Sequence, residues 1–266
     1  MKLSLSRLNV WLYAIVNNYV YRAYDVLFNN VARRQMLRVK EIPIIIINFN
    51  QLSYLQKLVD FLLDRKFENI VIIDNNSTYP PLLNFYEEIH EKVKIERMKE
   101  NYGHLVFFEQ EYLQEKYGKG FFVVTDADII PNINLPEDFL QQLLLHLFKN
   151  WRKITKVGFS LKIDDLPDEN HLKPKILLWE NKFWETEIEI GVYDAPLDTT
   201  FAIYKPGYPK RYNNIQFFAA HRFAGDFTAK HGGWYIRQNS LTEEQEFYAR
   251  TASASSSWLQ EEKNIQ

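Results

Sequence analysis

The 266-residue chain contains no cysteine and no uninterrupted apolar run of the roughly 20 residues that a membrane-spanning helix needs. Without cysteine there is no disulfide, no thiolate metal site and no cysteine nucleophile, which fits a reducing, cytoplasmic location. Neither Gly-x-Gly-x-x-Gly nor Gly-x-Ser-x-Gly occurs, which argues against a nicotinamide-dependent dehydrogenase and a serine hydrolase. The formal charge of −2 creates no overall field for nucleic acid, so no nucleic-acid partner is expected.

The first 40 residues differ in character from the rest of the chain. Residues 8–21 are uncharged and rich in aromatics, but asparagines interrupt them, and no small-residue cleavage site of a signal peptide comes after them. Several basic residues come next: Arg22, Arg33, Arg34, Arg38 and Lys40. We expect an N-terminal helical extension over residues 1–40. The sequence favours its packing on the main domain or a second subunit over peripheral contact with the cytoplasmic face of the inner membrane.

Strands and helices alternate through the first half of the remaining chain. Apolar, β-branched runs predict strands over residues 43–49, 69–74, 93–98 and 120–125. Helical spacing predicts helices from Ser53, which can cap the first, and over 82–90 and 105–117. Such alternation predicts an α/β fold with a mostly parallel, Rossmann-like central sheet flanked by helices.

The second half alternates less regularly. Helices are expected over residues 136–151 and 242–250, and strands over 157–163 and 199–204. No internal repeat and no linker interrupts the chain. We therefore expect a single catalytic domain over residues 41–258, followed by a C-terminal tail over residues 259–266.

Polar clusters follow each of the first four predicted strands. They are Asn48 with Asn50, then 74–77, then 101–104, then 126–128. In a parallel sheet the carboxyl ends of the strands lie at one edge, and ligands bind in the crevice beyond them. Each cluster alone could be turn chemistry, but four at corresponding places predict a binding site.

The motif Asp126-Ala127-Asp128 is the sharpest chemical feature. Two carboxylates at positions i and i+2 leave an extended segment on the same side, so both can face one crevice. Hard oxygen ligands suit Mg²⁺ or Mn²⁺, ions that also bind diphosphate oxygens. The alternative is an Asx turn that merely ends the strand.

With these motifs in view, residues from about Pro43 to Trp258 resemble the glycosyltransferase A fold, and family 2 glycosyltransferases in particular. The matching segments are IPIIIINFNQLSYLQKLVDFL, IVIIDNNST, NYGH, FFVVTDADIIP and HGGWY. The first half matches well, whereas the second half, which sets the acceptor, matches only loosely. The resemblance implies transfer of a sugar from a nucleotide-diphosphate donor, such as a UDP-sugar, to an acceptor hydroxyl.

The resemblance also implies roles for individual residues. It assigns nucleotide and sugar contacts to Asn48, Asn50, Asp74, Asn76, Asn101, Gly103 and His104. Asp126 is expected at the ribose or the metal, and Asp128 at the metal. His231 resembles the late histidine that completes the metal shell in several enzymes of this fold.

The general base is the least certain assignment. An inverting transfer needs a base at the acceptor hydroxyl, usually a carboxylate. The sequence favours Asp198, then Asp194, because both lie between the metal motif and His231, just before a predicted strand. The clean Glu-Asp pattern of the family is absent, and Glu243-Glu244, its nearest match, comes after His231.

By analogy with the family, the acceptor is expected to be a glycan or lipid-linked glycan in bacterial surface polysaccharide or lipopolysaccharide synthesis. Two alternatives stay open. A nucleotidyltransferase would need a glycine-rich, basic loop after the first strand, but that loop reads NFNQL. A non-catalytic module that binds nucleotide sugars or glycans would have no need for the cation.

Overall fold

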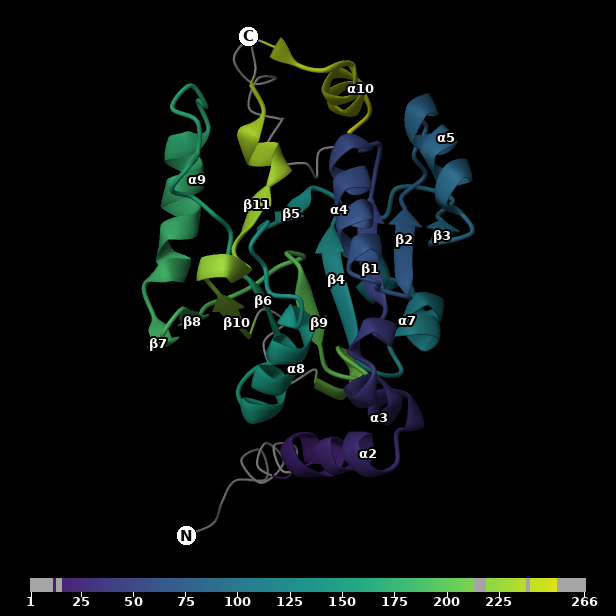
Figure 1. The fold of residues 1–266 in the computed structure, drawn as a ribbon, viewed down its shortest axis with the longest axis vertical. Coiled ribbons are helices and arrows are strands. Elements are labelled where there is room, and N and C mark those ends of the chain that lie inside the picture. The colour runs from purple at the N-terminus through teal and green to yellow at the C-terminus, as the bar shows by residue number, and fades with distance from the viewer. Residues whose placement is uncertain (1–11, 13–15, 213–218, 238–239, 253–266) are drawn as a thin grey trace.

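The computed structural model describes residues 12, 16–212, 219–237 and 240–252 (Figure 1). The predicted tail over residues 259–266 lies outside the described residues. A central sheet has helices on both sides, and the described part of the N-terminal extension is helical. That extension comprises a π-helical turn at Val16–Val20, α2 (Tyr21–Leu27), α3 (Asn30–Leu37) and a 3-10 turn at Val39–Glu41.

The strands and helices predicted in the first half are present, with small shifts at their ends. The elements are β1 (Ile44–Asn48), α4 (Ser53–Asp64), β2 (Ile70–Asp74), α5 (Pro80–Ile89), β3 (Lys94–Arg97), α6 (Val106–Glu109), α7 (Glu111–Tyr117), β4 (Phe122–Asp126) and β5 (Ile129–Pro131). The helix expected over 105–117 is broken at Gln110, whose extended backbone separates α6 from α7.

The second half contributes shorter elements. They are α8 (Phe139–Lys149), β6 (Lys156–Phe159), α9 (Lys173–Glu180), β7 (Glu187–Glu189), β8 (Val192–Asp194), β9 (Ala202–Tyr204), β10 (Ala220–Phe223), β11 (Ala229–His231) and α10 (Glu243–Thr251). Further 3-10 turns lie at Asn181–Trp184, Lys210–Tyr212, Gly225–Phe227 and Gly232–Tyr235.

Nine strands form the main sheet in the order β3-β2-β1-β4-β9-β6-β10-β8-β7. Only β9 and β8 run against the others, so seven of the nine strands point the same way and the predicted mostly parallel sheet is confirmed. The register aligns Asn48 with Asp74, and Ile47 with Asp126. Three of the predicted polar clusters therefore meet at one edge of the sheet.

Aromatic side chains fill the layers on both faces of the sheet. On one face, Phe122 stacks on Tyr204 with ring centroids 5.2 Å apart, and Phe107 of α6 packs on Phe122 at 5.0 Å. On the other face, Phe139 of α8 packs on Phe201 at 5.7 Å. The continuous apolar runs of β1, β2 and β4 are buried on both sides, as a sheet covered by helices on both faces requires.

No helix among the described residues is long and apolar enough to cross a membrane.

Candidate active site

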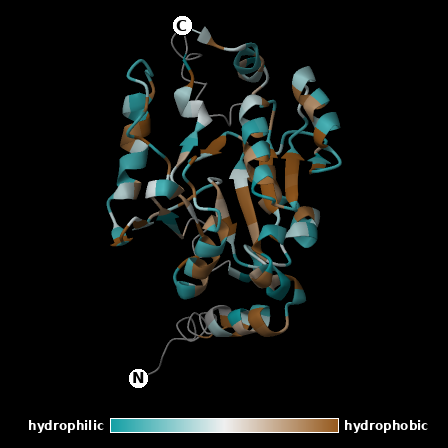
Figure 2. Cartoon of the chain, viewed as in Figure 1, coloured by the Kyte–Doolittle hydropathy of each residue, from teal (hydrophilic) through white to brown (hydrophobic). Residues whose placement is uncertain are grey.

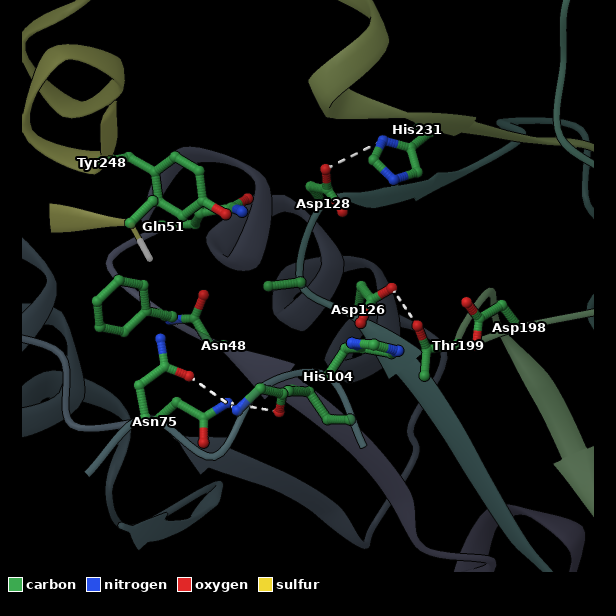
Figure 3. A pocket seen from close by; sticks show the side chains of 16 residues that line it. Asn48, Gln51, Asn75, His104, Asp126, Asp128, Asp198, Thr199, His231 and Tyr248 are labelled. Atoms are coloured by element: carbon green, nitrogen blue, oxygen red, sulfur yellow. Dashed lines mark hydrogen bonds and ion pairs between the residues drawn. The ribbon is translucent and has the colours of Figure 1, made fainter. Parts of the chain in front are cut away.

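A cavity of about 280 Å³ opens beyond the carboxyl ends of β1, β2 and β4 (Figure 3). Eight of the predicted site residues line it: Asn48, Asn101, Gly103, His104, Asp126, Asp128, Asp198 and His231. They come from segments up to 183 positions apart, since Asn48 and His231 face the same space. The predicted convergence of strand-end polar clusters is thus present as geometry.

Asp126 ends β4 and faces two other carboxylates across the cavity. The Thr199 hydroxyl donates a hydrogen bond of 2.5 Å to its Oδ2. Burial raises the pKa of Asp126 well above its usual range, and the nearby charges of Asp128 and Asp198 raise it further, with only the Thr199 hydrogen bond opposing them. Such a concentration of negative charge favours a cation or a proton at this place.

Asp128 and His231 are brought together by a small two-stranded ribbon. β5 and β11 pair antiparallel, with His231 opposite Ile129, the residue after Asp128. His231 Nδ1 lies 3.2 Å from Asp128 Oδ2, and the Gly233 amide donates to the same oxygen at 3.1 Å. The Trp234 ring stacks on the His231 ring at 5.0 Å and fixes its plane.

The two glycines after His231 are required by close approach. A β-carbon on Gly232 would lie 2.7 Å from the ring of Tyr54, and one on Gly233 would lie 3.2 Å from the His231 ring and 3.5 Å from Asp128 Oδ2. The chain can therefore wrap around the Asp128–His231 pair only without side chains at these positions.

A second wall of the cavity is built around Asn75. Its amide group donates to the Gly103 carbonyl at 3.0 Å and accepts from the Tyr102 amide at 3.3 Å. Its own backbone amide donates to the Asn48 carbonyl at 2.8 Å. Gly103 has φ +82°, a conformation that favours glycine. The loops after β1, β2 and β3 are thereby joined into one polar surface.

Four predicted site residues do not line this cavity. Asn50 is fully buried, and its side-chain oxygen accepts from the Thr78 and Tyr79 amides at 2.7 and 3.0 Å. Asp74 is also fully buried and pairs with Arg97 at 3.2 Å.

Asn76 is exposed on the turn after β2, and Asp194 is exposed on β8. In this arrangement Asn50 and Asp74 shape the loops that carry the cavity wall. The predicted ligand contacts of all four residues stay predictions.

Arg222 and Glu180 support the loop that carries Asp198. Their side chains form a buried ion pair, and Arg222 Nε donates to the Pro196 carbonyl at 2.7 Å. Burial raises the pKa of Glu180, opposed by Arg222, and lowers the pKa of Arg222, opposed by Glu180. The pair anchors the middle of the segment between Asp194 and Asp198.

Helix α10 lies over the open side of the cavity. Its Tyr248 lines the cavity, with its ring centroid 6.3 Å from that of Phe49. Its Glu244 accepts hydrogen bonds from the amides of Leu52 at 2.8 Å and Ser53 at 3.1 Å. The expectation that Ser53 itself caps α4 is therefore wrong, because a carboxylate nearly 200 residues away satisfies those amides instead.

Sequence reasoning missed several lining residues, including Phe49, Gln51, Asn75, Thr199 and Tyr248. Asn75 lies inside a predicted polar cluster, but the prediction selects its two neighbours. Thr199 begins a segment predicted as a strand. Nothing in the local sequence around Tyr248 indicates that its helix folds back over β1.

The sequence profile described as Glycosyl transferase family 2 matches residues 44–225, about two thirds of the chain. The chain belongs to this family. The match spans the strand ends, Asp126, Asp128 and Asp198, and it makes the protein a glycosyltransferase with the A-type fold. His231 and α10 lie beyond the matched residues.

Solved structures of two other glycosyltransferases are distantly similar to this one. The mannosyltransferase PcManGT from Pyrobaculum calidifontis, in complex with GDP-Man and Mn²⁺, is 15% identical, with 90% of this chain and 71% of that chain covered and a TM-score of 0.43. Residues 1–349 of TarS from S. aureus are 17% identical, with 79% and 54% covered and a TM-score of 0.40. A comparison with curated protein sequences finds no match.

The buried Arg222–Glu180 pair gives a stability prediction for this glycosyltransferase. Glu180→Ala should lower the free energy of unfolding by about 3–5 kcal/mol, because it leaves Arg222 buried without its partner. The melting temperature should fall by about 10 °C. Calorimetry should show most of this loss recovered in the double variant Glu180→Met, Arg222→Met. Glu87→Ala, at an exposed position on α5, is the matched control and should melt like the wild type.

Proposed function

We propose that this glycosyltransferase is metal-dependent and inverting, and that it transfers a sugar from a nucleoside-diphosphate donor to an acceptor hydroxyl. The observation that carries the proposal is the approach of Asp128 Oδ2 to His231 Nδ1 at 3.2 Å, beside Asp126, at the carboxyl edge of the sheet. A carboxylate and an imidazole held at this distance by a dedicated ribbon offer two ligand atoms to one ion.

The donor set fits Mn²⁺ or Mg²⁺ that is shared with a diphosphate. Across the part of the chain that the structure describes, no three or more His, Cys, Asp or Glu side chains gather as a complete metal site. Asp128 and His231 would supply the protein ligands, with Asp126 close by. Ions of this kind are commonly held by one or two protein carboxylates plus substrate phosphates. When bound, the cation offsets the negative charge that develops on the leaving diphosphate.

The nucleoside would lie between the β1 loop and α10. Phe49 and Tyr248 offer aromatic surfaces there, while Asn48, Asn75 and Asn101 offer amide groups that can hydrogen-bond a base or ribose. This places the base at one end of the cavity and the diphosphate near Asp128, with the sugar directed toward Asp126 and His104.

Asp198 is the proposed general base. Figure 3 shows its carboxylate beside Asp126 and Thr199, apart from the Asp128–His231 pair. In the proposed step Asp198 accepts the proton of the acceptor hydroxyl, and the hydroxyl oxygen bonds to the anomeric carbon. The bond from that carbon to the diphosphate oxygen breaks, and the nucleoside diphosphate leaves with the electron pair.

The biological setting that we propose is cytoplasmic synthesis of a bacterial surface polysaccharide or lipopolysaccharide, with a glycan or lipid-linked glycan as acceptor. It rests on analogy with the family and on the lack of cysteine.

A thermal-shift screen of nucleoside diphosphates with and without Mn²⁺ tests the donor class. At about 100 times its dissociation constant, the right diphosphate should raise the melting temperature by about 5 °C or more, because only the folded state binds it. The shift should require Mn²⁺ or Mg²⁺ and disappear with a chelator. Nucleoside monophosphates, which lack the second phosphate, are the matched control and should give a smaller shift.

Label transfer then separates the proposal from its alternatives. Label from the sugar of the selected donor should appear in an acceptor or, without acceptor, in free sugar. Release of pyrophosphate from a nucleoside triphosphate would instead mark a nucleotidyltransferase. Tight nucleotide binding without any turnover, with metal and a range of acceptors present, would mark a binding module.

A further inference from the structure

The polar residues of the N-terminal extension face the body of the protein. Asp25 on α2 is fully buried, and its carboxylate accepts from Asn29 and pairs with Arg211, each at 3.0 Å. Asn29 also donates to the Lys119 carbonyl at 2.8 Å. On α3, the Gln35 side chain donates to the Phe121 carbonyl at 2.9 Å. The extension is therefore attached below β4 largely through hydrogen bonds and one ion pair.

The apolar residues of the same segment face outward. Val16, Val20, Tyr24 and Leu27 recur at spacings of four, four and three along the helical stretch Val16–Leu27, so they share one face. We call these four residues the apolar stripe. Their exposed fractions are 38%, 52%, 45% and 57%. A surface helix normally buries its apolar stripe and exposes its polar face, and this helix does the reverse.

Further apolar side chains extend this exposed surface. Phe28 follows the stripe and is 69% exposed, and Leu37 at the end of α3 is 86% exposed. Figure 2 shows hydrophobic colour on α2 at the base of the molecule, and Figure 1 places α2 at the opposite end from α10. A partner seated on the stripe would leave the candidate active site open.

Charge indicates what that partner is. Residues 1–40 contain seven of the 32 Lys and Arg residues but only Asp25 of the 34 acidic ones, so they carry +6 while the rest carries −8. Leu37 lies between Arg34 and Arg38 on α3, and the Arg152 guanidinium lies 5.3 Å from the Tyr19 ring centroid. A second copy of this face would bring like charges together, whereas an anionic lipid surface complements both the apolar and the basic residues.

We propose that the N-terminal extension is a peripheral membrane anchor that inserts its apolar stripe among the headgroups of an anionic bilayer. The surrounding arginines then lie at the level of the lipid phosphates. The buried polar contacts of Asp25 and Gln35 hold the helix rigidly on the catalytic domain, so the enzyme is held on the bilayer with the carboxyl edge of its sheet pointing away from it.

Co-sedimentation of the full chain with vesicles tests this anchor. Vesicles of phosphatidylcholine and phosphatidylglycerol in equal amounts should bind the protein, vesicles of phosphatidylcholine alone should bind it much more weakly, and salt should weaken the binding. Tyr24→Ser with Leu27→Ser should reduce partitioning by about 10²-fold, because each replacement removes roughly a tenfold contribution from apolar burial. The melting temperature should not fall, since both side chains are exposed.

A matched control replaces exposed leucines elsewhere. Leu145→Ser with Leu178→Ser, at positions 61% and 82% exposed on α8 and α9, should bind vesicles like the wild type. Equal binding by the Tyr24, Leu27 variant and the wild type would overturn the proposal. So would a wild-type protein that ignores vesicles and forms a dimer by light scattering, with the same double variant monomeric, because the stripe would then be a subunit interface. Nucleoside-diphosphate binding, measured separately, should not change with either double variant.

Discussion

Replacing Asp128 with asparagine should lower the rate of sugar transfer by about 10³-fold or more, with the fold intact. The carboxylate is the charged protein ligand proposed for the cation, and an amide offers a neutral oxygen in the same place. The amide oxygen can still accept the Gly233 hydrogen bond, which is 3.1 Å long in the wild type. The measurement is transfer of labelled sugar at several Mn²⁺ concentrations, and we expect the Mn²⁺ concentration for half-maximal rate to rise sharply.

The control for this variant is Asp60→Asn. Asp60 is an exposed aspartate on α4, away from the cavity, and its replacement should leave both rate and Mn²⁺ dependence unchanged. Full activity of Asp128→Asn with the wild-type Mn²⁺ dependence would remove the metal role from this residue. Loss of activity accompanied by a lower melting temperature would instead show that Asp128 matters for holding the ribbon of β5 and β11 together.

The first half of the fold could be predicted because local pattern and final structure agree there. β1, β2 and β4 are buried on both faces, so each must be a continuous apolar run, and such runs are visible in the sequence. Each run ends in a polar cluster at the same edge of the sheet. The position of Asp126 and Asp128 follows from these two facts and needs no knowledge of the second half.

Side-chain direction within a turn is harder to predict. The prediction includes the cluster after β2 but selects Asp74 and Asn76, whereas Asn75 faces the cavity. Asn76 has φ +62° and Asn50 has φ +51°. Left-handed residues of this kind redirect the chain, so the alternation of a strand no longer tells which side chain faces the ligand.

The elements that close the site depend on contacts between distant residues. β7, β8 and β11 are each only three residues long, too short for a periodic pattern. Glu244 caps α4 from 191 or more positions away, and Asn50 donates to Thr251 at 3.0 Å across 201 positions. Only the assembled sheet brings these residues together, so local propensity could predict α10 as a helix but not its place over the cavity.

Replacing Asp198 with asparagine should lower kcat by about 10³-fold while leaving the affinity for the nucleoside diphosphate unchanged. An asparagine cannot accept the proton of the acceptor hydroxyl, and general-base catalysis commonly contributes 10²–10⁴-fold, as a rough range. The residue is exposed at the cavity wall, so its replacement should not lower the melting temperature. Steady-state transfer with saturating donor, together with a thermal-shift titration of the diphosphate, measures both quantities.

Asp194→Asn separates the two proposed bases. Asp194 lies on β8, outside the cavity lining, on the same segment that Arg222 anchors through the Pro196 carbonyl. Its replacement should cost transfer less than about tenfold, because it removes a charge near the site but no proton acceptor within it. If Asp194→Asn is the inactive variant and Asp198→Asn retains its rate, Asp194 is the base. In that case the segment between them must move when the acceptor binds, since only a shift of β8 would bring that carboxylate into the cavity.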